Sequence, residues 1–486
     1  MEFKVKPIIA GNVAEDMERT APVRWALAGL SLSMLLPSLG TSIANVGLPT
    51  LAQAFAAPFQ AVQWVVLAYL LAITTLIVGV GRLGDLIGRR RLMLGGIALF
   101  TAASALCGVA PTLWLLIAAR AAQGAGAAVL MALAMAFVGE TVPKARAGSA
   151  MGLLGTMSAI GTALGPSLGG ALIAGPGWRA IFLVNIPLGV LTFLLAHRTL
   201  PADRRGSGNA AGFDRAGTLL LALTLAAYAL AMTMGHGRFG ALNLGLLLTA
   251  AIGVGLFLRV EARAASPLIR PALFRDPALG PGLAMSALVS TVMMATLVVG
   301  PFYLAGGMGL DAASVGLALS AGPLAAALAG VPAGRLADRF GAGRTAIAGL
   351  AGIAAGCLIL SAMPAPMAMT LGSPGYVLPI VVVTVGYALF QTANNTAVMA
   401  DVHADRRGVV SGMLNLSRNL GLVTGASAMG AVFALASGAA DVATASPEAV
   451  STGLRITFAV ATGLVVAALV VGVGSRVRAA RLGNAS

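Results

Sequence analysis

The chain has 486 residues, of which 58% are hydrophobic and 10% are charged, and its mean hydropathy is +0.93. Soluble domains carry about 25% charged residues because their surfaces face water. The composition therefore excludes a soluble globular protein and indicates a chain that faces lipid. The net charge of +15 comes from short clusters between apolar runs, so we interpret it as membrane orientation signals rather than a nucleic-acid-binding surface.

Fourteen apolar runs are long enough to cross about 30 Å of hydrocarbon. In chain order they cover residues 24–51, 61–81, 92–110, 112–139, 147–173, 180–197, 216–235, 241–258, 280–304, 314–334, 345–363, 376–400, 408–436 and 454–475. Residues 1–23 mix acids and bases and lack the apolar core of a signal peptide. The sequence thus predicts an all-α integral membrane protein whose first helix directs insertion.

Basic residues predict the orientation of these helices. With fourteen spans both termini lie on one side, and 26 of the 31 lysines and arginines fall there. The opposite side holds Arg179, Arg238 and Arg455, and Arg120 and Arg418 lie within spans. Because cytoplasmic loops of membrane proteins are enriched in lysine and arginine, we expect both termini in the cytoplasm.

The chain contains an internal repeat. The pattern G-R-L-x-D-x-x-G-x-x-R occurs at Gly81–Arg91 and again at Gly334–Arg344, 253 residues later. A second set recurs 260 residues later, in which Arg146, Gly148, Gly152, Gly161 and Gly165 correspond to Arg406, Gly408, Gly412, Gly421 and Gly425. Two parallel six-helix halves with an extra helix pair between them explain both offsets.

We therefore predict five regions. They are a cytoplasmic tail at 1–23, a six-helix bundle at 24–200, a two-helix insert at 201–265, a second six-helix bundle at 266–475 and a C-terminal tail at 476–486. Halves of this kind rock against each other about a central site. The two cysteines, Cys107 and Cys357, lie inside apolar runs and offer neither a disulfide framework nor a metal-ligand spacing, so we expect no metal and no cofactor.

At these residues the chain resembles the major facilitator superfamily, and within it the fourteen-helix drug–proton antiporter branch. The repeated pattern resembles that superfamily's loop between helices 2 and 3. Residues 116–128 resemble its helix-4 motif, centred on Arg120, and residues 178–187 resemble the branch's W-R-W-I-F-x-I-N-x-P segment. Helix 5 matches an exporter pattern, G-x8-G-x3-G-P-x2-G-G, through Gly152, Gly161, Gly165, Pro166, Gly169 and Gly170.

The first helix departs from the branch. Where the branch typically carries an aspartate, this chain has Gly40, and no acidic residue lies deep in any span. A cation exporter gains from a mid-membrane carboxylate. Its absence, beside two intramembrane arginines, favours neutral or anionic substrates. Glu140 and Asp85, near the cytoplasmic face, and a proton carried by the substrate remain alternatives for coupling.

The repeated pattern has two interpretations. A carboxylate at Asp85 can pair with arginines and with a helix N-terminus in the other half, which would form a conformational latch. We favour the latch over a simple orientation cluster because orientation requires basic residues only. Its candidate residues are Gly81, Arg82, Asp85, Gly88 and Arg89, with Asp338 as the weaker counterpart.

The intramembrane polar residues also have two interpretations. A charge in the bilayer costs at least about 2.5–3.5 kcal/mol, so arginines there face a cavity or pair with polar groups. We favour proton coupling or substrate binding for Arg120 with Gln123, and leave Arg418 open between the cavity and helix packing. Polar and adaptable side chains at helical spacing suggest a cavity wall, although each alone fits interhelical packing. They are Ser38, Thr41, Asn45, Trp64, Tyr69, Met293, Tyr387, Gln391, Asn394 and Asn415.

The resemblance implies a secondary active exporter in a bacterial cytoplasmic membrane, acting by alternating access on drug-like small molecules and driven by protons. No G-x-x-x-x-G-K-[ST] motif is present, so we expect neither ATP hydrolysis nor any other enzymatic activity. We expect a monomer in the lipid bilayer without a nucleic-acid partner. The alternatives are a dedicated exporter of one neutral or anionic endogenous metabolite, an uptake symporter, and a non-transporting membrane sensor. The helix-5 pattern argues against uptake through resemblance alone.

Overall fold

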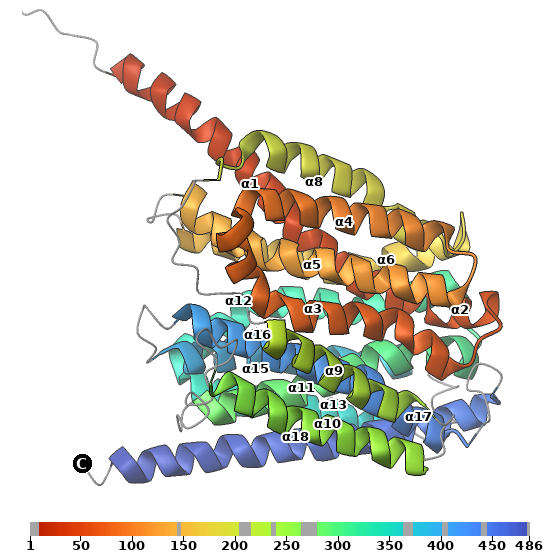
Figure 1. Cartoon of the computed structure of the whole chain (residues 1–486). Helices are drawn as coiled ribbons and strands as arrows, with labels where there is room; N and C mark the ends of the chain where they lie inside the picture. Colours follow the sequence, from red (N-terminus) through yellow and green to blue (C-terminus); the bar gives the residue numbers. More distant parts are fainter. Residues whose placement is uncertain are drawn as a thin grey trace, which may run out of the picture.

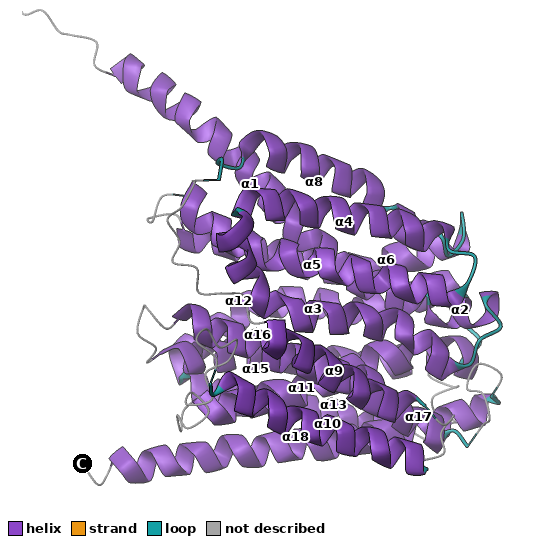
Figure 2. Cartoon of the chain, viewed as in Figure 1, coloured by secondary structure: helices purple, strands orange, loops and turns teal. Residues whose placement is uncertain are grey.

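The computed structural model describes residues 9–142, 147–203, 215–234, 240–263, 279–362, 373–400, 407–438 and 445–483. In these residues the chain folds into helices and loops, without a strand (Figure 2). Helices dominate because a backbone in lipid has no water to bond, so its N–H and C=O groups must pair within the segment. Within the described residues, fourteen helices are long and apolar enough to span a membrane, which confirms the predicted number.

The N-terminal half holds six spans. Its helices are α1 (Ile9–Val46), α2 (Leu48–Ala54), α3 (Phe59–Ile87), α4 (Arg89–Val109), α5 (Leu113–Thr141), α6 (Ala147–Ala174), α7 (Ala180–Leu183) and α8 (Asn185–Thr199). Two further helices, α9 (Arg215–Thr233) and α10 (Ala241–Glu261), form the insert. Helix α1 begins before its membrane span and projects beyond the bundle (Figure 1).

The C-terminal half holds the other six spans. Its elements are α11 (Leu279–Phe302), the π-helical turn η3 (Tyr303–Gly307), α12 (Ala312–Phe340), α13 (Ala342–Ala362), α15 (Ser373–Ala400), α16 (Arg407–Thr424), the π-helical turn η4 (Gly425–Met429), α17 (Gly430–Ala436) and α18 (Pro447–Gly483). The predicted boundary at residues 265 and 266 lies outside the described residues. Figure 1 shows the two halves side by side, with both ends of the chain at the same end of the bundle.

Close glycine packing relates the two halves. In the first half, a Cβ at Gly126 of α5 would lie 2.8 Å from the carbonyl oxygen of Gly96 in α4. In the second half, a Cβ at Gly386 of α15 would lie 2.7 Å from the carbonyl oxygen of Gly349 in α13. These pairs are separated by 253 and 260 residues, the same offsets as the repeat. Each half therefore uses the small residue to bring two backbones together.

The insert packs beside the junction of the halves rather than apart from them. The Trp64 indole of α3 donates to the Thr233 hydroxyl of α9, with 3.1 Å between Nε1 and Oγ1. Leu221 and Leu225 of α9 belong to the same buried cluster as Met413 and Leu416 of α16. Helix α9 thus contacts an element of each half, and Figure 1 shows α9 and α10 over that side of the bundle.

Candidate functional site

A cavity of about 220 Å³ lies between the two halves, near the middle of the spans. Helices α1, α3, α5 and α6 line it from the first half, and α11, α12, α15 and α16 line it from the second. Its wall is mostly apolar, with a small number of polar side chains, which is the usual make-up of a small-molecule site. Among the described residues that line it, Arg418 is the only charged one.

Five of the residues singled out in the sequence line this cavity: Ser38, Thr41, Met293, Tyr387 and Arg418. The Ser38 and Ser158 hydroxyls form a hydrogen bond of 2.6 Å between α1 and α6. The Thr41 hydroxyl donates to the Pro37 carbonyl within α1, at 2.9 Å. The first-half side of the cavity therefore presents hydroxyls that already have partners.

Several polar residues of the wall were not predicted from the sequence. They are Ser42, Ser158, Thr162, Thr296, Tyr376, Thr384 and Asn419. Ser158 lies 260 residues before Arg418, so the repeat offset gives the signal that would have pointed to it. Asn419 follows Arg418 directly and shares its position in the cavity.

Arg120 lies outside the cavity wall, in an enclosed polar cluster of the first half. Its side chain is fully buried. Its Nε donates to the Val65 carbonyl at 2.9 Å, and its Nη1 donates to Oε1 of Gln123 at 2.5 Å. The guanidinium carbon lies 4.1 Å from the centroid of the Tyr69 ring. Gln123 in turn donates a hydrogen bond from its Nε2 to the Ser104 hydroxyl, at 2.7 Å. Backbone, amide and aromatic groups thus stabilise a buried charge for which no ion pair is found among the described residues.

Gly40 lies beside this cluster. A Cβ there would lie 3.5 Å from the Tyr69 hydroxyl and 3.4 Å from the Phe100 ring. The Tyr69 hydroxyl donates instead to the Pro37 carbonyl, at 2.9 Å. The position where the branch typically has an aspartate therefore adjoins the aromatic ring on which Arg120 stacks.

The other residues that were predicted to form the cavity wall lie outside its lining. Asn45 donates to the Thr41 carbonyl within α1, and Asn394 donates to the Gly282 carbonyl of α11 at 3.2 Å. Trp64 contacts the insert through Thr233. Gln391 and Asn415 are half-buried. In this conformation Asn394 and Trp64 join helices together, whereas Asn45 bonds within its own helix.

The helix-5 glycines divide between two neighbours. A Cβ at Gly161 would lie 2.6 Å from the Leu35 carbonyl oxygen, and Cβ atoms at Gly165 and Gly169 would also meet α1. A Cβ at Gly170 would instead lie 2.5 Å from the carbonyl oxygen of Ala312 in α12. The first three positions therefore pack inside one half, whereas Gly170 packs across the junction. Nothing is described for the surroundings of Gly152.

The repeated pattern Gly81–Arg91 begins within α3, and its Gly88 forms the turn between α3 and α4. Gly88 has φ +100° and lies against the carboxylate of Asp203, which follows α8. The Asp203 oxygens accept from the backbone N–H groups of Arg90 at 2.7 Å and Arg91 at 3.2 Å. This carboxylate offsets the arginines that crowd the positive end of α4.

Other latch candidates differ in what surrounds them. A Cβ at Gly81 would meet nothing within 4 Å, and Asp338 is exposed. Arg89 contacts the Gly84 position through its side chain. The side chains of Arg82, Asp85 and Glu140 lie outside the described residues.

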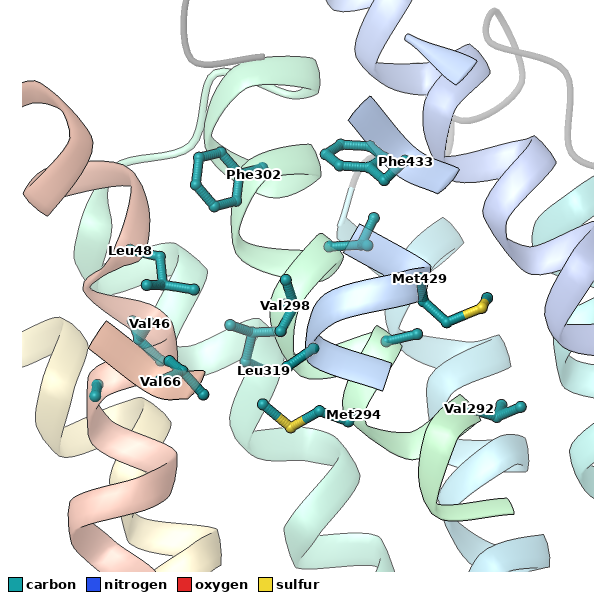
Figure 3. Packing of buried hydrophobic residues seen from close by; sticks show 14 of the residues in the cluster. Val46, Leu48, Val66, Val292, Met294, Val298, Phe302, Leu319, Met429 and Phe433 are labelled. Carbon is teal, nitrogen blue, oxygen red and sulfur yellow. The ribbon is translucent and has the colours of Figure 1, made fainter. Parts of the chain in front are cut away.

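The two halves meet firmly at the end of the bundle opposite the termini. The Phe59 ring of α3 packs against Phe302 and Phe433 of the second half, at centroid distances of 4.6 and 5.7 Å. Gln63 donates to the Ala426 carbonyl of η4 at 3.0 Å. Figure 3 shows apolar side chains of α1, α2 and α3 facing α11, η4 and α17 at this junction. These contacts seal one end of the cavity.

Comparison with known proteins places this geometry in a family. Residues 30–426 match the family model described as Major Facilitator Superfamily. The chain is 33% identical over 425 residues to the multidrug resistance protein Stp of Mycobacterium tuberculosis (strain CDC 1551 / Oshkosh), covering 86% of this chain and 77% of that protein. It is 31% identical over 427 residues to the drug efflux pump JefA of the same strain, covering 86% and 82%.

It is also 30% identical over 414 residues to the riboflavin transporter RibZ of Clostridioides difficile (strain 630), covering 85% of this chain and 88% of that protein. Two solved structures share the fold. A bacterial homolog of the human lysosomal transporter Spinster, inward-facing and unoccupied, has a TM-score of 0.66 at 16% identity and covers 94% and 97% of the two chains. The nucleoside transporter NupG has a TM-score of 0.66 at 13% identity, with coverage of 93% and 99%.

The family match covers most of the chain, the relatives exceed 30% identity, and the fold has fourteen spans in two related halves. Members of this family are membrane transporters and not enzymes. The chain therefore belongs to the Major Facilitator Superfamily.

Proposed function

We propose that this chain is a secondary active exporter that moves small organic molecules out of a bacterial cytoplasm by alternating access. The observation that carries the proposal is the mostly apolar cavity with a few polar side chains that lies between two related halves, which Phe59, Phe302 and Phe433 seal at one end. Rocking of one half against the other would open this seal and close the opposite end. The likeness to Stp and JefA, named as multidrug resistance and drug efflux proteins, favours drug-like substrates.

We place both termini in the cytoplasm, because 26 of the 31 basic residues lie on their side of the membrane. In this proposal the sealed end then faces outward, and substrate enters the cavity from the cytoplasmic side. In this proposal the Gly81–Arg91 turn acts as a latch that closes the cytoplasmic end in the other state. The glycine faces of α6 let α1 and α12 pack closely while the halves move.

Export is driven in this proposal by the proton gradient, with one chain as the transport unit. The described residues that line the cavity include no acid, so in this proposal the coupling group lies elsewhere. Asp85 and Glu140 near the cytoplasmic face are the carboxylate candidates. The Arg120–Gln123 cluster is the candidate for transmitting protonation to the helices, because it joins α5 to the backbone of α3.

A second candidate function is the export of one neutral or anionic metabolite. The likeness to RibZ, named as a riboflavin transporter, favours it. So does the cavity wall, where Arg418 is the only charged side chain among the described lining residues. A narrow substrate range would separate this function from multidrug export.

The test is flux through purified protein in liposomes with an imposed proton gradient, across a chemically diverse panel of compounds. The proposal expects extrusion of at least one compound class, abolished when the gradient is collapsed. Uptake coupled to proton entry would indicate a symporter instead. A complete absence of flux for the whole panel, in protein shown to be folded, would favour a sensor.

A further inference from the structure

The two halves place different groups at one symmetry-related position of the cavity. In the first half, a Cβ at Gly161 would meet Ser38 of α1 at 3.1 Å; in the second, a Cβ at Gly421 would meet Ser290 of α11 at 2.7 Å. Ser38 therefore corresponds to Ser290. The 260-residue offset that relates these glycines also relates Ser158 to Arg418.

The first-half position is internally satisfied. The hydroxyls of Ser38 and Ser158 bond each other at 2.6 Å, so neither needs a ligand. The second half has no such pair. The Ser290 hydroxyl oxygen and the Arg418 Nε are both buried and have no hydrogen-bond partner among the described residues. Where the first half has two hydroxyls bonded to each other, the second half thus has a cationic donor without a partner among the described residues.

The residue next to Arg418 also has an unpartnered donor. Nδ2 of Asn419 is buried without a hydrogen-bond partner among the described residues, and Asn419 lines the cavity beside Arg418. The Tyr387 phenol lines the same cavity. A buried donor without a hydrogen-bond partner costs free energy, and a buried charge without a counter-ion costs more. An acceptor that carries negative charge would satisfy both residues at once.

Other parts of the wall suit an apolar body. Met293, Met294, Leu297 and Leu422 line the same cavity, and methionine adapts to ligands of varied shape. No acidic residue is found among the described lining residues to compete for the guanidinium or to attract a cation.

From this arrangement we propose that Arg418 and Asn419 form an anion-recognition site, and that substrates combine an apolar ring system with one carboxylate or similar anionic group. This inference rests on the proposed transport function and narrows it to a substrate class. Arg418 binds the anion as a charged donor, Asn419 adds an amide donor, and the methionine and leucine wall holds the apolar part.

The probes are three compounds of one shape: 2-naphthoate, the neutral 2-naphthamide and the cationic 2-naphthylmethylammonium. Equilibrium binding is measured by calorimetry on the full chain in lipid nanodiscs, and flux is measured in liposomes. Wild-type protein should bind naphthoate about tenfold or more tightly than naphthamide, since hydrogen bonds to charged groups contribute a difference of that order. The cation should bind most weakly.

Three variants locate the effect. Arg418→Gln should lower the ratio of naphthoate to naphthamide affinity by about tenfold or more, and Arg418→Lys should retain part of it because the charge remains. Asn419→Ala, the second test should Arg418→Gln fail to fold, should lower the same ratio about threefold. Arg455→Gln is the matched control, because Arg455 is exposed on α18 and donates to the Ser361 carbonyl, outside the cavity lining.

The outcomes separate the inference from the proposed function. Equal affinity of wild-type protein for all three probes, no binding of any probe, or an unchanged ratio in Arg418→Gln, would overturn the anion site. If naphthamide or the cation were transported as well as naphthoate, the anion site would also be overturned, but the proposed export function would stand. Selective naphthoate binding with no flux of any probe would uphold the site and count against the exporter.

Discussion

The two arginines inside the membrane occupy opposite kinds of environment. Arg120, in the first half, is fully enclosed: it donates to Val65 and Gln123 and stacks on Tyr69, and its Nη2 is buried without a partner among the described residues. Arg418, in the second half, is half-buried at the cavity wall, with its Nε unpartnered among the described residues. An arginine side chain thus joins helices of the first half at one position and lines the cavity at the other. An intramembrane charge therefore indicates a special role, but its hydrogen bonds decide which role.

The largest expected effect tests this difference directly. Arg120→Ala should lower the free energy of unfolding by about 3 kcal/mol, because it leaves a buried carbonyl and amide without a donor and opens space beside Tyr69. Arg418→Gln should lower it by less than about 0.5 kcal/mol, since no bond among the described residues is lost. Thermal unfolding midpoints in one detergent measure both. Equal destabilisation by the two variants would remove the contrast between the halves.

The second effect concerns the glycines that hold each half together. A Cβ at Gly421 would clash with the Ala287 backbone carbonyl, and a Cβ at Gly161 would approach the Leu35 carbonyl at 2.6 Å. Gly421→Ala and Gly161→Ala should each cost about 1–3 kcal/mol through overpacking. Gly81→Ala is the control, because nothing lies within 4 Å of its Cβ. If Gly421→Ala and Gly161→Ala had the same unfolding midpoint as Gly81→Ala, close backbone approach at these glycines would not be required.

A third effect distinguishes the two equivalent turns. Gly88 and Gly341 both have positive φ, but Asp203 lies against Gly88 and accepts from two N–H groups of α4, whereas a Cβ at Gly341 would meet nothing within 4 Å. Asp203→Ala should cost about 0.5–2 kcal/mol, as loss of a helix cap does. Hydrogen exchange should then accelerate at the start of α4 and remain unchanged at the start of α13. Equal protection in the variant and the wild type would contradict the cap.

The smallest effect lies at the start of equivalent helices. Asp311 accepts from the Ser314 N–H at 2.9 Å and caps α12, whereas Pro58 gives α3 no side-chain cap. The hydrogen bonds from Ser314 hold the pKa of Asp311 below its ordinary value of 3.8. The carboxylate's contribution to stability is therefore present above that value and is lost as pH falls through the lowered pKa. Asp311→Asn should lower the unfolding midpoint slightly at neutral pH, and that difference should shrink in acid; a constant difference would contradict the assignment.

The sequence predicted the helices well because membrane spans depend on composition and length. Fourteen spans and the repeat follow from apolar runs and from glycines at fixed offsets, without knowledge of contacts. The insert was predicted as a helix pair, but its contact with Trp64 was not, since that indole was assigned to the cavity wall. A helix's rotation about its axis decides such assignments, and neighbouring helices set that rotation.

The candidate site was predicted in part for the same reason. Ser38 and Arg418 carry polar groups at mid-span and line the cavity, whereas Tyr69 and Asn394 carry similar groups and turn towards other helices. Ser158 and Thr162 lie four residues apart in α6 and both line the cavity, but the bond of Ser158 is to Ser38, 120 residues away. Likewise Asp203 caps a helix more than 100 residues earlier. Pairings over such distances appear only in the folded chain.

The most direct test of the central claim is a distance measurement across the sealed end of the cavity. Spin labels at Gln53 of α2 and Glu448 of α18, both exposed and in different halves, report the separation of the halves at that end. We expect two distance populations in lipid nanodiscs, with the longer one gaining weight on addition of a transported compound or a change of pH. A single, unchanging distance under every condition would contradict alternating access.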